Sequence, residues 1–249
     1  MPRDPARSRH TTPAPAAITN SDEFAVGDFA LVSADNVRFR IDGFYLQSAS
    51  AVFRDMMASA SGVRELHFTD ERFETALVIF RFLQLVTTST FGVFEPGREL
   101  FADYEELFGV VRLCRFLAKY ECGVATAVLA LRVKEGLMGS TRSGAHAFIV
   151  GAAIGDDALC VAALGVGPGL SWTVDDLPLD MHAPTFEVGA RCLNPLALPY
   201  EYACLIPRAY HWALGRAFLR SVGPSDMGDH FKKFLAVAKA HNGDVGGLR

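Results

Sequence analysis

The stretch from Asp28 to Phe53 constrains the fold more than any other part of the chain, because strand, turn and helix patterns follow one another within it. Residues 37–41 alternate between apolar and charged side chains, which is typical of a strand with one buried face. Residues 29–33 form a second apolar run, and Ala34-Asp35-Asn36 between the two runs tolerates the left-handed backbone of a tight turn. The pattern predicts an antiparallel β-hairpin.

Helical spacing begins directly after this hairpin. Leu46, Ala49, Phe53 and Met57 recur at the spacing of one helix face, and Ser50 lies where its side chain can cap a second helical segment. The sequence therefore predicts a hairpin that leads into a pair of helices.

Further elements are predicted up to residue 137. A short strand is expected at residues 65–68, then a helix from Glu71 to about Val86 with Thr69 or Asp70 as its cap, and two helices over 104–120 and 121–137. Residues 87–103 have no clear period but several phenylalanines. These aromatic side chains either fold back onto the core or form a patch that binds a partner.

The two ends of the chain have different compositions. Residues 1–24, whose first part contains many Pro, Ala, Thr and Arg residues, are predicted to form a disordered tail. The arginines would suit a transit peptide, but the prolines would break the amphipathic helix that such a peptide needs. From residue 138 onward, helices are expected over four segments: residues 143–153, 156–164 with Asp156 as a cap, 200–221 with an interruption near Pro207, and 229–241. Glycines and prolines between residues 165 and 195 predict loops.

Composition limits the class of protein. The chain has 249 residues, half of them hydrophobic, which is enough to bury a substantial core. Its formal net charge is −4 and neither half has an excess of Lys and Arg, so we expect neither nucleic acid nor a membrane surface as a partner. Five scattered cysteines, with no secretory signal and no long apolar segment, predict a soluble intracellular protein in the cytoplasm or nucleus.

No pattern in the sequence supports catalysis. Gly165-x-Gly167-x-Gly169 lacks the Lys that ends a phosphate-binding loop, and residues 148–155 lack the first glycine pair of a dinucleotide fingerprint. A zinc site could be gathered from Cys192, Cys204, His182 and His211, but these residues lack the closely spaced pairs of structural zinc sites. A catalytic triad could be sought in Ser225, Asp226 and His230, but these residues lie where a helix cap is expected. We therefore expect no catalytic, cofactor-binding or metal-binding residues.

Three segments together suggest a family. The hairpin residues Phe39-x-Ile41 followed by Leu46 and by Ser50-x-x-Phe53 resemble the opening of a BTB/POZ domain. Residues 65–70 are similar to the third strand of that family and the acidic turn after it, and residues 113–121 are similar to its Ala-x-Lys-Tyr helix. The resemblance covers about the first half of the chain, which looks like the fungal BTB proteins that carry no other known domain.

The resemblance implies an α+β fold and an interaction function. We expect a BTB/POZ-like helical cluster flanked by a short β-sheet over residues 25–137, followed by an all-helical region over residues 138–249. The expected function is non-enzymatic association with another protein, with adaptor activity for a cullin-based ubiquitin ligase as a narrower possibility. An enzyme with a site in the C-terminal half and a purely structural family member are the alternatives.

Two candidate surfaces follow from the resemblance. Family members commonly self-associate through the first helix, which here carries Phe44, Tyr45, Gln47 and Ser48. The alternative for this helix is that Phe44 or Tyr45 turns inward and fastens it to the hairpin. A cullin scaffold would contact Arg54 and Met57 and the loop over residues 58–62.

Overall fold

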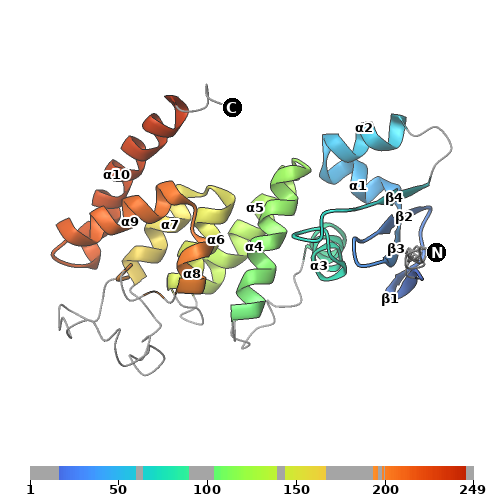
Figure 1. Cartoon of the computed structure of the whole chain (residues 1–249), viewed down its shortest axis with the longest axis horizontal. Helices are drawn as coiled ribbons and strands as arrows, with labels where there is room; N and C mark the ends of the chain where they lie inside the picture. Colours follow the sequence, from blue (N-terminus) through green and yellow to red (C-terminus); the bar gives the residue numbers. More distant parts are fainter. Residues whose placement is uncertain are drawn as a thin grey trace, which may run out of the picture.

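One small sheet and a larger set of helices make up the fold, which is of mixed α+β type. The computed structural model describes residues 17–59, 64–89, 104–138, 144–166, 193–195, 198 and 200–244. Figure 1 shows the sheet at one end of the molecule and the last two helices at the other, with the remaining helices between them. No helix in these described ranges is both long enough and apolar enough to cross a membrane.

The sheet has four strands in the order β1-β3-β2-β4, which are β1 (Thr19–Ala25), β2 (Phe29–Val32), β3 (Val37–Ile41) and β4 (Glu65–His67). β2 and β3 run antiparallel with Phe29 opposite Ile41, which confirms the predicted hairpin. Asn36 in the turn has a φ of 62°, a left-handed conformation that Asn tolerates. β4 pairs in parallel with β2 and confirms the short strand predicted at residues 65–68.

β1 corrects the predicted tail. Residues 19–24 form most of a strand that lies parallel to β3, so a tail that extends to residue 24 is wrong; residues 1–16 lie outside the described residues. Most side chains of β1 are exposed, and its position depends on backbone pairing, as between the Thr19 N–H and the Asn36 carbonyl oxygen at 2.9 Å. The hydrophobic pattern therefore gave no indication of a strand.

A glycine allows β1 to reach its place beside β3. The connection from β1 to β2 must cross the end of β3, which lies between the two strands. Gly27 makes this crossing with a φ of 150°, and a Cβ atom there would lie 2.2 Å from the carbonyl carbon of Ile41. Any other residue at this position would clash with the backbone of β3.

The helices follow the sheet in chain order. They are α1 (Gly43–Ala49), α2 (Ala51–Ser59), α3 (Ala76–Thr88), α4 (Tyr104–Lys119), α5 (Gly123–Met138), α6 (Gly144–Ile154), α7 (Asp157–Val166), α8 (Tyr200–Leu205), α9 (Arg208–Arg220) and α10 (Pro224–Asp244). Each predicted helix is present, and Asp156 caps α7 as expected by accepting a hydrogen bond from the Leu159 N–H at 2.8 Å. The break between α8 and α9 falls at Pro207, also as predicted.

The start of α3 differs from the prediction. The helix begins at Ala76 and not at Glu71, and neither Thr69 nor Asp70 caps it. The Asp70 carboxylate instead accepts hydrogen bonds from Arg72, in a turn that precedes the helix. The Ala76 N–H is bound at 2.7 Å by the Asp35 carboxylate, so a side chain from the hairpin turn takes the place of the expected cap.

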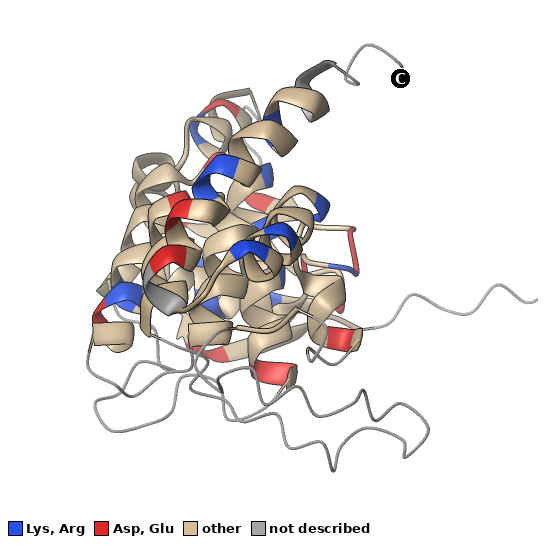
Figure 2. Cartoon of the chain, turned by 90° about the vertical axis from the view of Figure 1, so that its left-hand side faces the viewer, with Lys and Arg blue, Asp and Glu red and all other residues tan. Residues whose placement is uncertain are grey.

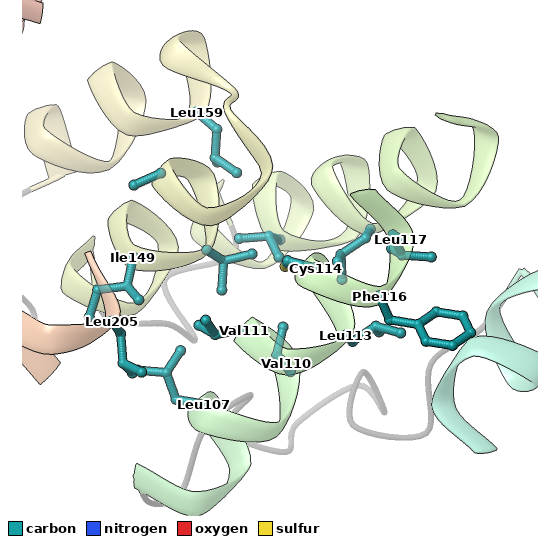
Figure 3. Packing of buried hydrophobic residues seen from close by; sticks show 14 of the residues in the cluster. Leu107, Val110, Val111, Leu113, Cys114, Phe116, Leu117, Ile149, Leu159 and Leu205 are labelled. Atoms are coloured by element: carbon teal, nitrogen blue, oxygen red, sulfur yellow. The ribbon is translucent and has the colours of Figure 1, made fainter. Parts of the chain in front are cut away.

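α4 connects the two expected regions through one core. Figure 3 shows Leu107 and Val111 of this helix near Ile149 of α6 and Leu205 of α8, whereas Phe116 points toward the sheet end. Buried side chains from the sheet to α10 belong to a single hydrophobic cluster. The core is therefore continuous across residue 137, where the sequence analysis placed the boundary between the two regions.

Candidate interaction surface

α1 is fixed to the hairpin by its first and fourth residues. The Gly43 N–H donates a hydrogen bond of 2.7 Å to the Asp28 carboxylate, which stands at the start of β2. Met57 of α2 packs over this point so closely that a Cβ atom on Gly43 would lie 2.5 Å from the Met57 terminal methyl. Leu46 is fully buried, and its position sets which face of α1 points to solvent.

The four predicted residues of α1 lie together, but the two aromatic side chains differ. Phe44 is 72% exposed, whereas Tyr45 is half-buried and packs against the core. The rings meet edge to face with centroids 5.9 Å apart. Gln47 and Ser48 are exposed, and the Ser48 hydroxyl donates to the Tyr45 carbonyl oxygen at 3.0 Å. Tyr45 thus fastens the helix, and Phe44 is the aromatic residue that faces solvent.

The two candidate surfaces are adjacent. Arg54 of α2 is exposed, and its guanidinium group donates a hydrogen bond of 3.0 Å to the Gln47 carbonyl oxygen. Met57 is only partly exposed, because it covers Gly43. Of the loop predicted over residues 58–62, Ala58 and Ser59 instead form the end of α2, and residues 60–62 lie outside the described residues. Phe44, Gln47, Ser48 and Arg54 therefore form a surface, which we call the α1–α2 surface.

Ser50 joins this surface to α4. Its hydroxyl oxygen accepts a hydrogen bond of 3.2 Å from the Phe53 N–H, which confirms it as the predicted cap of α2. The same hydroxyl donates to the carbonyl oxygen of Tyr120. The Tyr120 ring stacks on the Phe53 ring with centroids 4.8 Å apart, so polar and aromatic contacts act between the same elements.

A buried carboxylate fixes the segment before α3 to the end of α4. Glu74 is 1% exposed and accepts hydrogen bonds from the Tyr120 hydroxyl at 2.7 Å and the Asp70 N–H at 2.7 Å, together with an ion pair from Lys119. Burial opposes ionisation, but Lys119 and the N–H donors outweigh it, so the pKa of Glu74 lies below its usual value. Burial and the adjacent Glu74 raise the pKa of Tyr120. These paired groups are structural.

A similar cluster lies at the other end of the molecule. Asp157 of α7 accepts a hydrogen bond of 2.7 Å from the Tyr210 hydroxyl of α9, and Lys239 of α10 lies 2.7 Å from the same carboxylate. Burial, followed by the bond to Asp157, raises the pKa of Tyr210. The three groups satisfy one another and connect three helices.

Most cysteines of the described chain are buried thiols. Cys114, Cys122 and Cys160 are buried. Burial raises the pKa of Cys114 and of Cys122 to about 12, so both thiols stay protonated at neutral pH. Cys204 is exposed, and no group of three His, Cys, Asp or Glu residues within the described ranges is placed to hold a metal ion.

The remaining sequence alternatives fall on helices or outside the described residues. Residues 148–154 belong to α6, so the strand that a dinucleotide fingerprint would require there is absent. Asp226 binds the N–H groups of Val222 and Gly223 at 3.0 and 3.1 Å, as a residue at a helix start does. The glycines after Val166 in the predicted loop, the phenylalanines between residues 90 and 103, and His182 and Cys192 lie outside the description.

Sequence reasoning missed His146. It lies on α6, is 6% exposed, and stacks on Tyr202 with ring centroids 6.0 Å apart. Burial lowers its pKa to about 4, so the imidazole is neutral at physiological pH. An apolar run that begins directly after this His, over residues 147–154, was the available signal for a buried histidine.

Comparison with known proteins yields no relative for this chain. No family model, no curated protein and no solved structure matches it. Function must therefore be argued from the surfaces and clusters described above.

Proposed function

We propose that this chain is a non-enzymatic protein-interaction module of BTB/POZ type that self-associates through the α1–α2 surface. The observation that carries the proposal is Phe44, which is 72% exposed on a helix held rigidly by Asp28, Met57 and Leu46. A large aromatic side chain that stays in water forgoes about 1.5–3 kcal/mol of burial. A second copy would supply that burial without a conformational change in α1.

The arrangement of elements also supports the family resemblance. A hairpin, a helical pair with Ser50 at the junction, a third strand and the segment Ala118-Lys119-Tyr120 at the end of α4, which is similar to the family's Ala-x-Lys-Tyr, occur in the order that the resemblance implies. The Lys and Tyr of that segment have defined structural partners, because Lys119 and Tyr120 both bind Glu74. The likeness thus extends to residues that hold the cluster together.

Light scattering coupled to gel filtration tests the proposal. We expect a dimer at tens of micromolar, and we expect Phe44→Asp to weaken dimerisation by about 30-fold or more, as loss of a central anchor does. The matched control is Leu219→Asp on α9, because Leu219 is 73% exposed and lies at the opposite end of the molecule. A parent chain that is strictly monomeric at this concentration would refute self-association.

A cullin-adaptor role is a second proposal, supported by the exposure of Arg54 at the edge of the same surface. In a pull-down with purified cullin at micromolar concentration, we expect binding by the parent chain and loss of binding with Arg54→Glu. The absence of binding by the parent chain would remove the adaptor role and leave self-association as a separate question.

A further inference from the structure

A second surface, separate from the α1–α2 surface, lies between α9 and α10 and carries exposed arginines. Arg208, Trp212, Arg216 and Arg220 follow one another at every fourth position of α9, and all four are exposed. Residues four apart lie on the same side of a helix, so the four side chains form one stripe. Figure 2 turns this end of the molecule toward the viewer and shows Lys and Arg on several turns of its helices.

The arginines of the stripe have no acidic neighbours to neutralise them. α9 contains no Asp or Glu. None of the three guanidinium groups forms an ion pair with a residue in the described part of the chain. Because like charges four residues apart on a helix repel, an anion between Arg216 and Arg220 would relieve their repulsion.

A groove runs beside the stripe. Ala209 and Trp212 of α9 and Ala238 of α10 line it, with Arg208 and His241 also at its wall, and its volume is about 360 Å³. The indole of Trp212 is 41% exposed and is held by edge-to-face contact with Phe234, with ring centroids 5.9 Å apart. The Arg216 guanidinium lies 5.6 Å from the centroid of the indole ring, so the charged stripe and the groove are continuous.

We propose that this groove binds an acidic peptide segment of another protein. A large apolar side chain of the peptide would lie against Trp212 and the two alanines, and carboxylates on either side would pair with Arg208 and Arg216. Guanidinium groups form paired hydrogen bonds with carboxylates, and Trp and Arg are the commonest anchors of protein interfaces. The site is separate from the α1–α2 surface and does not depend on self-association.

Nucleic acid and anionic membranes fit the site less well. Both bind through many phosphate contacts, whereas the stripe offers three cations on a chain of net charge −4. The groove is an open and mainly apolar depression beside the cations, which matches an apolar side chain on a peptide better than a continuous polyanion.

Fluorescence anisotropy with labelled synthetic peptides tests the proposal on the full chain. The probes are a short peptide of Glu and Asp around a Leu-Phe pair, the same peptide with Ser in place of Leu and Phe, and the same peptide with Lys in place of its acids. We expect the first to bind at micromolar concentration and the other two to bind at least about tenfold more weakly. Equal binding of the first two peptides would overturn the proposal, because the groove would then have no part in binding.

Variants locate the site. Trp212→Ala is expected to weaken binding about 30-fold and Arg216→Glu about tenfold, with circular dichroism to confirm that each variant is folded. Lys134→Glu on α5 is the matched charge control and Phe44→Asp the control for self-association, and both should bind the peptide like the parent chain. Unchanged affinity in Trp212→Ala or Arg216→Glu would overturn the proposal. So would tighter binding, dependent on Trp212, to a single-stranded oligonucleotide or to phosphatidylserine vesicles.

Discussion

The two ends of the molecule use the same three functional groups, but the carboxylate is buried in one cluster and exposed in the other. At the sheet end, Glu74 binds a tyrosine hydroxyl and a lysine, and its side chain is 2% exposed. At the helical end, Asp157 binds a tyrosine hydroxyl at the same distance of 2.7 Å together with a lysine, but its side chain is 47% exposed. Contacts of the same kind can therefore be compared under burial and under solvent screening.

Burial changes what each cluster contributes to the fold. Removing one member of a buried cluster leaves the other groups without partners away from water, which costs far more than the cluster itself contributed. At the exposed pair of Asp157 and Lys239, water can replace a lost partner. We therefore expect the sheet end to depend on its cluster and the helical end to depend on apolar packing.

The largest effect is expected for Glu74→Ala. The substitution leaves the Tyr120 hydroxyl and two backbone N–H groups without an acceptor, so we expect a loss of about 3–5 kcal/mol in the free energy of unfolding. Urea unfolding followed by circular dichroism measures it. Glu71→Ala, an exposed neighbour, should change stability by less than about 0.5 kcal/mol. If the two variants were equally stable, the buried cluster around Glu74 would not be needed for the stability of the sheet end.

His146 gives the helical region a buried titratable group of its own. Its pKa is about 4 in the folded chain against an ordinary 6.5, so the unfolded chain takes up the proton first as the pH falls. Stability is thus fully present above about pH 6.5 and declines toward pH 4, by at most about 3 kcal/mol. Urea unfolding over this pH range should show the decline in the parent chain.

His146→Phe is the matching variant, because it keeps an aromatic ring against Tyr202 and removes the titration. The decline between about pH 6.5 and pH 4 should become shallower in this variant. Glu74 adds to the decline only near its lower limit, since its pKa is lowered from 4.5 in the folded chain and its contribution is lost as the pH falls below about 4.5. An identical slope in parent and variant would show that His146 is not the group that titrates.

A smaller effect is expected for Gly27→Ala, which acts on the attachment of β1. The added Cβ would overlap the backbone of Ile41, and strain of about 1–3 kcal/mol is relieved if β1 leaves the sheet. Hydrogen exchange should show faster exchange at Thr19 and unchanged protection in α4. Gly123→Ala, where no atom lies within 4 Å of the added Cβ, is the control. Retained protection at Thr19 would contradict the role of Gly27.

Local patterns explain which parts of the fold could be predicted from the sequence. The hairpin, the two helices after it and the Ser50 cap follow from alternation, helical spacing and a polar residue between two apolar runs. β1 could not be predicted, because backbone pairing and the single ring of Phe24, which contacts Phe39 and Phe80, hold it without an alternating buried face. The start of α3 was misplaced because Asp35, distant in sequence, caps it.

The candidate sites show the same division. The sequence placed Phe44 and Tyr45 together but could not decide which of them turns inward, since that depends on how Leu46 is buried against other elements. The spacing of Arg208, Trp212 and Arg216 is visible in the sequence. The groove beside them is not, because α10 supplies its second wall.

The smallest effect is expected at Asp157 and provides the other limit of the comparison. The Asp157 and Lys239 side chains are 47% and 46% exposed, so solvent screens their attraction, and a coupling of less than about 1 kcal/mol is expected. A double-mutant cycle of Asp157→Asn and Lys239→Met, measured by urea unfolding, isolates this term. A coupling as large as the loss in Glu74→Ala would mean that the contacts themselves, and not their burial, determine stability at both ends. A small coupling would mean that apolar side chains stabilise the contact of α10 with α7 and α9, among them Phe231 and Met227, which are fully buried.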